Sequence, residues 1–308
     1  MKVVITGASG FIGRYLATAL RGQGNTVVGV GRSEAVALSG STDLLQVHTD
    51  YSLPHLESLL AQVDVVIHLA GRRSQRSDHL LSITPFVEPN LSLLERLLDA
   101  SASARVKKFV FASTIAAYSQ ANAVPYQESD KVSGLNPYGW SKIAGEGLVD
   151  LWGRSGHMQT TSLRLAAGFG YGERLSAVLM RFIDQASRKE PLIVRGNRHV
   201  GVDQLYVKDI VGAFMAAIAP NARNGLFNIG SGRAYRLEEM ALAVANAFPD
   251  VEVRFEDDPA VGAAGPYMDT TAASTGLGWC IEWPLEKALA DVYDTWCAAT
   301  TPIKRGSK

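Results

Sequence analysis

The chain has 308 residues, of which 47% are hydrophobic and 19% charged, values ordinary for a globular protein with a sizeable core. Its 30 Lys and Arg residues balance 30 Asp and Glu residues, so no overall positive field would attract nucleic acid. No apolar run approaches the roughly 20 residues that span a bilayer. The N-terminus lacks the apolar stretch of a signal peptide, and Cys280 and Cys297 have no zinc or redox spacing. We therefore expect a cytoplasmic protein with reduced cysteines, no metal site, and no membrane or nucleic-acid partner.

Short apolar strands alternate with helical segments over the first half of the chain. Strands are predicted at 2–6, 26–31, 64–71, 107–113 and 160–166, with helices at 14–24, 53–62, from about 89, and at 137–156. This alternation predicts an α/β fold with a doubly wound parallel sheet of the Rossmann type. Beyond residue 166 the pattern loosens into helices near 175–189, 208–219 and 236–248, with short strands at 192–194, 225–230 and 251–255.

A glycine-rich segment, TGASGFIG, follows the first strand and enters the first helix, with Gly7, Gly10 and Gly13 three residues apart. Glycines in this context permit a tight turn, close approach of a pyrophosphate, and close helix–strand packing. The helix N-terminus adds free N–H groups for phosphate. We interpret residues 1–165, with returning segments at about 203–231, as a dinucleotide-binding domain. Residues of about 166–202 and 232–302 would then form a smaller mixed α/β substrate domain.

The segment NPYGWSK places Tyr138 and Lys142 four residues apart, which puts them on one face of a helix opened by Pro137. A free tyrosine has a pKa of about 10, and a nearby ammonium would lower it. Tyr138 could then exchange a proton with a hydroxyl or a carbonyl. The segment FASTIAAYS supplies a hydroxyl, from Ser113 or Thr114, at a strand end where open α/β sheets bind ligands. The alternative is a packed aromatic ring and a solvated lysine.

A series of motifs in order along the chain resembles the extended short-chain dehydrogenases/reductases, and among them the NAD-dependent epimerase/dehydratase family, which acts largely on nucleotide sugars. The motifs are TGASGFIG, DVVIHLAG, FVFASTIAAYS, PYGWSK, SLRLAAGFGYGE, YVKDI, FNIGSG and LGW. The resemblance implies Thr114, Tyr138 and Lys142 as catalytic residues, with Ser113 as the less favoured hydroxyl. It also implies that Lys142 binds the nicotinamide ribose.

The resemblance further implies which residues bind the dinucleotide. They are Gly7, Gly10, Phe11, Ile12, Gly13, Arg32, Ser33, Asp50, Tyr51, Leu69, Ala70, Gly71, Asn90, Ala112, Tyr138, Lys142 and Leu165. Members usually end the second strand with an acid that binds the adenosine ribose. Here Gly31 takes that position and Arg32 follows, and a guanidinium suits a 2′-phosphate. This favours NADP over NAD, although Arg32 could equally be an exposed residue beside bound NAD. His68 is interpreted as a packing residue.

Departures from the family pattern concern the substrate. Ala167 replaces a frequent asparagine and Val202 replaces an arginine that contacts the sugar diphosphate; Arg195 or Arg198 could substitute for it. Ile115 and Ala116 follow Thr114 where the 4,6-dehydratases carry acids, so dehydration is not expected.

Three functions remain open from the sequence. The first is a nucleotide-sugar 4-epimerase, the second an NADPH-dependent reductase of a keto sugar or another carbonyl, and the third a non-catalytic dinucleotide sensor. The family also implies a homodimer formed through the tyrosine-bearing helix and the helix before the catalytic strand. The spacing of Leu91, Leu94, Leu97 and Leu98 is compatible with that interface, or with intramolecular core.

Overall fold

A computed structural model describes residues 1–32, 45–75, 78, 81–173, 177–195, 200–256 and 265–300. The strands are β1 Lys2–Thr6, β2 Thr26–Gly31, β3 Leu45–His48, β4 Val65–His68, β5 Lys108–Thr114, β6 Gln159–Leu165, β7 Ala167–Phe169, β8 Leu192–Arg195, β9 Gly201–Val202, β10 Gln204–Tyr206, β11 Gly225–Ile229, β12 Tyr235–Arg236 and β13 Val253–Glu256. The α-helices are α1 Phe11–Gly22, α2 Leu53–Leu60, α3 Thr84–Phe86, α4 Leu93–Ser103, α5 Pro137–Arg154, α6 Val178–Ser187, α7 Val207–Ala217, α8 Leu237–Ala247, α9 Thr271–Leu277 and α10 Leu285–Thr300. A π-helical segment, η1 Val87–Ser92, and a 3₁₀ turn, η2 Ile115–Ala117, complete the set.

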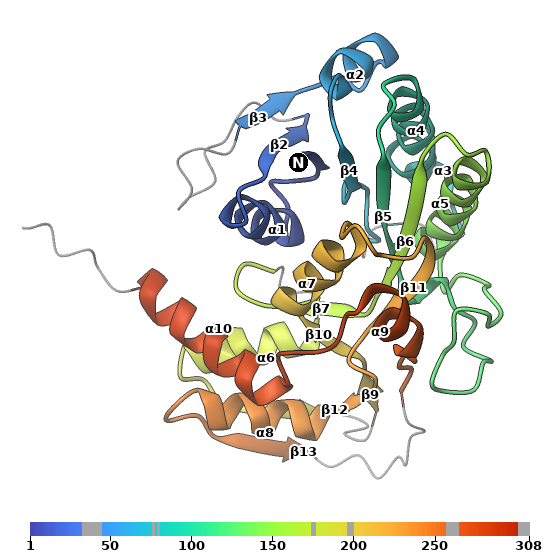
Figure 1. Cartoon of the computed structure of the whole chain (residues 1–308). Coiled ribbons are helices and arrows are strands. Elements are labelled where there is room, and N and C mark those ends of the chain that lie inside the picture. Colours follow the sequence, from blue (N-terminus) through green and yellow to red (C-terminus); the bar gives the residue numbers. More distant parts are fainter. Residues whose placement is uncertain are drawn as a thin grey trace, which may run out of the picture.

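The centre of the molecule is a seven-stranded parallel sheet in the order β11-β6-β5-β4-β1-β2-β3 (Figure 1). Because the strands are parallel, their carboxyl ends all lie at the same end of the sheet. The strand order reverses between β1 and β4. Open α/β sheets bind ligands at this kind of reversal. The predicted doubly wound parallel sheet is confirmed, and β11 is a late segment that returns to it.

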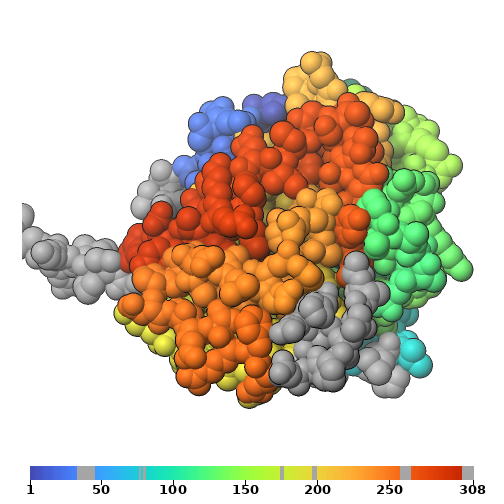
Figure 2. Space-filling model, turned by 90° about the horizontal axis from the view of Figure 1, so that it is seen from below, coloured from blue at the N-terminus to red at the C-terminus, as the bar shows by residue number. Residues whose placement is uncertain are grey.

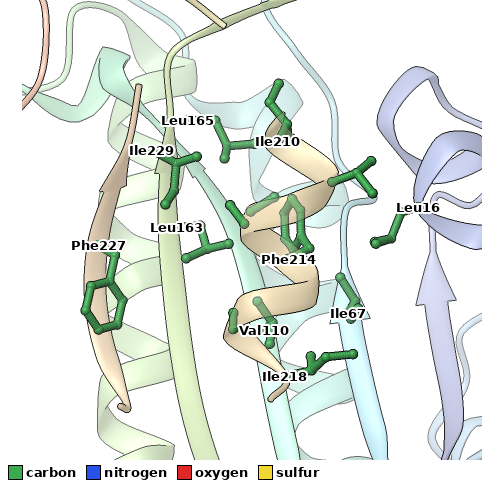
Figure 3. Packing of buried hydrophobic residues seen from close by; sticks show 14 of the residues in the cluster. Leu16, Ile67, Val110, Leu163, Leu165, Ile210, Phe214, Ile218, Phe227 and Ile229 are labelled. Carbon is green, nitrogen blue, oxygen red and sulfur yellow. The ribbon is translucent and has the colours of Figure 1, made fainter. Parts of the chain in front are cut away.

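Two hydrophobic clusters cover the two faces of this sheet. Side chains of β5 alternate between them: Val110 belongs to the cluster under α1, α7 and α9, while Phe109 and Phe111 belong to the cluster under α2, α4 and α5. Figure 3 shows the first cluster, where Ile210 and Phe214 of α7 lie against side chains of the strands. Burial on both faces explains why the strands are continuous apolar runs.

A third cluster joins α6, α8 and α10 with β8 below the main sheet. Leu179 and Ile183 of α6, Val244 of α8 and Leu289 of α10 are all fully buried in it. Viewed from below, the surface is mostly formed by the C-terminal third of the chain, orange to red in Figure 2. Helices α6 and α8 match the predicted segments, whereas α10 was not among the predicted elements. No helix among the described residues is both long and apolar enough to cross a bilayer.

Several predicted boundaries differ from the structure. The first helix, expected at 14–24, spans Phe11–Gly22. The strand expected at 64–71 ends at His68, and residues 69–75 form a loop at the edge of the sheet. The helix expected from about residue 89 begins at Thr84 and passes through η1 before α4. On α4, Leu94, Leu97 and Leu98 are fully buried in the second cluster, so the intramolecular interpretation of that leucine stripe is correct for these three.

Candidate active site

The glycine loop has geometry that only glycine satisfies at two of its three positions. Gly7 has φ +74°, and a Cβ built there would lie 2.9 Å from the Ala70 nitrogen. A Cβ on Gly13 would lie 2.2 Å from the Gly7 carbonyl oxygen, because the first turn of α1 packs directly on the loop. The Gly10 N–H donates to that same oxygen over 2.9 Å and closes the turn. These contacts agree with the tight turn and the close helix packing expected from the sequence.

Beside this loop lies a cleft of about 740 Å³. Nine predicted cofactor residues line it, namely Gly7, Gly10, Phe11, Ile12, Gly13, Arg32, Leu69, Gly71 and Ala112. Sequence reasoning missed the other lining residues, Ser9, Arg14, Arg72, Arg73, Gln75, Pro85, Glu88, Pro89, Gly172 and Glu173. Four arginines and two glutamates give this lining a positive balance, which suits an anionic ligand. The glycine cradle and the cleft therefore fit a dinucleotide.

Asn90 lies behind the cleft wall. It is almost fully buried, and its Oδ1 accepts the Arg72 N–H over 2.7 Å while its Nδ2 donates to the Ser141 Oγ over 2.8 Å. Asn90 thereby ties the loop after β4 to helix α5.

Most of the remaining predicted cofactor residues do not line the cleft. Asp50 is exposed, and its carboxylate accepts a hydrogen bond from the Ser52 N–H over 2.9 Å. This hydrogen bond lowers the pKa of Asp50 below its usual value. Tyr51 is buried with φ 59° and donates to the Val30 carbonyl over 3.4 Å. Ala70 donates its N–H to Thr6, and Leu165 is buried at the end of β6. Ser33 lies outside the described residues.

The three proposed catalytic side chains come together where β5 meets the start of α5. The Asn136 side chain accepts the Gly139 N–H over 2.9 Å and caps α5, and Pro137 occupies its first turn. This places Tyr138 near the Thr114 hydroxyl, which acts to lower the pKa of the phenol. Lys142 donates to the Ala112 carbonyl over 2.8 Å, and a Cβ on the cleft residue Gly71 would lie 3.6 Å from its Nζ.

The electrostatics of Tyr138 differ from the sequence expectation. Burial raises the pKa of Tyr138 above 10, and the charge that lowers it most is that of Arg73, not that of Lys142. The Lys142 ammonium lies 6.0 Å from the tyrosine ring centroid and is held by a carbonyl. Burial also lowers the pKa of Lys142 to about 8, against the charge of Glu146. That Lys142 lowers the pKa of Tyr138 stays a prediction.

Ser113 points away from this site, because neighbouring residues of a strand face opposite sides of the sheet. Its hydroxyl donates to the Glu146 carboxylate, which also accepts Arg164 Nε over 2.9 Å and Nη2 over 2.7 Å. The geometry thus favours Thr114 over Ser113. His68 is fully buried, stacks on Phe111 and has a pKa lowered to about 3 by burial, in line with a neutral packing residue.

The positions where the chain departs from the family pattern lie in the short strands below the sheet. Ala167 belongs to β7, and Val202 of β9 pairs with Tyr235 of β12. Arg195, considered as a substitute for the missing arginine, instead forms an exposed ion pair with Glu256 over 2.6 Å. Arg198, the other possible substitute, lies outside the described residues.

Comparison with known proteins agrees with this geometry. Residues 3–230 match the model of the NAD dependent epimerase/dehydratase family. The chain belongs to this family. A UDP-glucose 4-epimerase of Mycolicibacterium smegmatis is 28% identical over 96% of this chain and 98% of its own length. The membership confirms the resemblance inferred from the motifs and makes the protein an NAD-dependent enzyme of the extended short-chain type.

Solved structures of family members superpose along nearly the whole chain. The UDP-N-acetylglucosamine 4-epimerase from Bacillus cereus has a TM-score of 0.87 at 29% identity, covering 96% of this chain and 99% of that one. MoeE5, solved in complex with UDP-glucuronic acid and NAD, has a TM-score of 0.81 at 28% identity, covering 98% of this chain and 100% of that one.

Proposed function

We propose that the protein is a nucleotide-sugar 4-epimerase that works through a keto intermediate. The observation that carries this proposal is the meeting of Thr114, Tyr138 and Lys142 beside a glycine-lined cleft, in a chain whose relatives include UDP-sugar 4-epimerases. The proposed substrate class is the nucleoside-diphosphate sugars, most closely the UDP sugars named for those relatives.

The roles of the side chains follow from their positions. A bound oxidised dinucleotide supplies the acceptor for the sugar hydride and the donor for its return. Thr114 holds the sugar oxygen, and Tyr138 takes its proton and later gives it back. Lys142, held by the Ala112 carbonyl beside Gly71, is placed to hydrogen-bond the nicotinamide ribose. Residues of about 166–202 and 232–302 would bind the nucleotide and the sugar.

For the dinucleotide, we propose a preference for NADP. Arg32 lines the cleft at the end of β2, where Gly31 leaves no carboxylate to bind a ribose hydroxyl. A Cβ on Gly31 would lie 3.5 Å from Gln46 Nε2, an ordinary contact, so packing does not forbid an acid there. The guanidinium could pair with a 2′-phosphate.

A reductase would use the same side chains for half of the cycle, with Tyr138 as general acid. Denaturing the purified protein and identifying the released dinucleotide by mass spectrometry separates the two functions. An epimerase retains NAD⁺ or NADP⁺ near one per chain. An empty protein that binds NADPH better than NADH would indicate a reductase.

The variant Tyr138→Phe tests whether the site is catalytic. It should abolish turnover and leave dinucleotide binding largely intact, since it removes one hydroxyl at the reacting end of the cleft. Unchanged turnover would exclude the proposed chemistry, whereas dinucleotide binding without turnover in the wild type would leave the dinucleotide-sensor hypothesis.

We also propose a homodimer formed through α5 and η1, in a cytoplasmic protein. Both elements carry exposed apolar side chains, with Trp140 48% and Leu151 57% exposed on α5 and Val87 40% exposed on η1. Leu151→Glu should convert a dimer to a monomer in analytical ultracentrifugation. Leu242→Glu, on an α8 leucine that is 48% exposed, should leave the dimer intact. A wild type that sediments as a monomer would contradict the proposal.

A further inference from the structure

An ion pair joins two segments of the candidate active-site cleft that are far apart in the sequence. Arg73 lies in the loop after β4 and Glu173 in the loop after β7, and the Arg73 Nη2 donates to the Glu173 Oε1 over 2.8 Å. Both residues line the cleft beside the glycine loop. In the part of the chain that the structure describes, no other hydrogen bond or ion pair joins residues 69–75 to residues 170–173.

The loop that carries Arg73 is fastened to elements on one face of the main sheet. Asn90 of η1 accepts the Arg72 N–H over 2.7 Å and donates to the Arg72 carbonyl over 3.0 Å. Its Nδ2 also donates to the Ser141 Oγ of α5 over 2.8 Å. Helix α4, which continues η1, and helix α5 cover the face of the sheet that holds the second hydrophobic cluster. The Arg73 guanidinium therefore reaches the cleft from this face.

The loop that carries Glu173 is fastened to the opposite face. The Tyr171 carbonyl accepts hydrogen bonds from Arg14 Nη2 over 3.2 Å and from the Tyr15 hydroxyl over 3.0 Å, both on α1. Gly172 packs directly on the Arg14 guanidinium and leaves no room for a Cβ. Helix α1 covers the face of the sheet that holds the first hydrophobic cluster. The ion pair therefore crosses the cleft from one face to the other.

The two members of the ion pair differ in their access to solvent. The Glu173 side chain is 5% exposed, whereas the Arg73 side chain is 54% exposed. An ion pair that water reaches on one side contributes little free energy, because solvent competes with it. A glycine with positive φ lies just before each residue, Gly71 with φ 155° and Gly172 with φ 84°, and small residues of this kind often serve as hinges. The pair can therefore break and re-form while the rest of the fold stays in place.

We propose that the Arg73–Glu173 ion pair is a bridge that closes the cleft over a bound dinucleotide and has to open before the dinucleotide can leave. The inference deepens the proposed function and rests on it, since an epimerase must keep its dinucleotide between the two hydride transfers. The bridge acts on the rates of dinucleotide entry and release, and it takes no part in the proton transfer at Tyr138.

Charge alone predicts the opposite effect of removing the Glu173 carboxylate. A dinucleotide carries negative phosphates, so Glu173→Gln would remove a repulsion and free Arg73 to attract the ligand. Both changes would slow release. A bridge predicts instead that Glu173→Gln opens the cleft and speeds release. The direction of the change in this variant therefore separates a bridge from a simple charge effect.

The test measures the release of NADH and NADPH from the full-length protein, followed by fluorescence after a chase with excess NAD⁺ or NADP⁺. Glu173→Gln should release the more tightly bound dinucleotide about fivefold faster than the wild type, equivalent to about 1 kcal/mol. The double variant Arg73→Met/Glu173→Gln keeps the net charge of the pair at zero and should also release it faster. Arg188→Met, which breaks an exposed ion pair with Asp184 on α6, should match the wild type.

Association rates give the second observable. A bridge slows entry as well as release, so both rates should rise in Glu173→Gln, and the affinity should change less than the release rate. Faster release with an unchanged association rate would assign the pair to ligand binding and overturn the proposal. Release at the wild-type rate or slower, in Glu173→Gln or in the double variant, would also overturn it.

The experiment uses no sugar, so its outcome is separate from that of the proposed function. Faster entry and release support the bridge even if no nucleotide sugar is turned over, and a failed bridge leaves the epimerase proposal intact. Urea denaturation of each variant shows whether the fold itself has loosened. Unfolding midpoints equal to that of the wild type support the bridge. Faster release in every variant, Arg188→Met included, together with lowered midpoints would attribute the release to a loosened fold and overturn the proposal.

Discussion

Helix α1 contains two glycines that should respond in opposite ways to the same added methyl group. A Cβ on Gly13 would lie 2.7 Å from the Ala8 Cα, whereas carbon atoms normally pack at about 3.5–4.0 Å. The glycine loop would have to retreat by about an ångström. Overpacking of this kind costs about 1–3 kcal/mol. Gly22 is exposed in the last turn, with no atom within 4 Å of its Cβ position. Gly22→Ala should raise the free energy of unfolding by up to about 1 kcal/mol, because alanine has a higher helix propensity than glycine.

The two variants should therefore differ by about 1–4 kcal/mol in the free energy of unfolding, measured by urea denaturation. Calorimetric titration with NAD⁺ or NADP⁺ supplies the second observable. Gly13→Ala should lose about tenfold or more in affinity, equivalent to at least about 1.4 kcal/mol, because the displaced loop forms the phosphate cradle. Gly22→Ala should bind as the wild type does. Equal stability and equal affinity in the two variants would refute the close-packing account of the loop.

Three further predictions concern charged residues. Arg164→Met should destabilise by about 3–5 kcal/mol in urea denaturation, because it strands the buried Glu146 carboxylate. Arg154→Met, which breaks an exposed ion pair with Asp150, should lower the free energy of unfolding by no more than about 0.5 kcal/mol. Equal losses of stability in Arg164→Met and Arg154→Met would contradict this contrast. Arg32→Ala should weaken NADP binding far more than NAD binding, and an equal loss would remove the argument for a 2′-phosphate site. Between pH 8 and 10.5 the unfolded chain holds the Lys142 proton more tightly than the folded protein. Raising the pH over that window should increase the free energy of unfolding of the wild type relative to that of Lys142→Met, by at most about 3 kcal/mol. If the free energies of unfolding of the two proteins changed in parallel with pH, the burial of the Lys142 charge would be contradicted.

Features set by neighbouring residues were readable from the sequence. Strand β1 and the start of α5 agree with their predicted positions, because an apolar run and a helix-opening proline act locally. The strand end and the helix start placed a hydroxyl, from Ser113 or Thr114, near Tyr138, and the family resemblance favoured Thr114. Strand β3 was missed, since four residues at the edge of a sheet carry little periodicity.

Features that depend on long-range packing were not readable. The partner of Arg73 lies 100 residues away along the chain, so no local pattern indicates the ion pair. The spacing of Tyr138 and Lys142 showed that they share a helix face, but not that a carbonyl of β5 would hold the ammonium. Burial, which dominates the pKa of both groups, becomes visible only when the strands and helices are packed together.

The most direct test of the proposed epimerase uses the purified protein with no dinucleotide added. UDP-glucose, UDP-N-acetylglucosamine and UDP-glucuronic acid are incubated separately, and the configuration at C4 is followed by proton NMR. We expect at least one sugar to reach an equilibrium with its 4-epimer, with no net consumption of cofactor and no reaction in Tyr138→Phe. Strict dependence on added NADPH, with a reduced product and no epimer, would contradict the proposal.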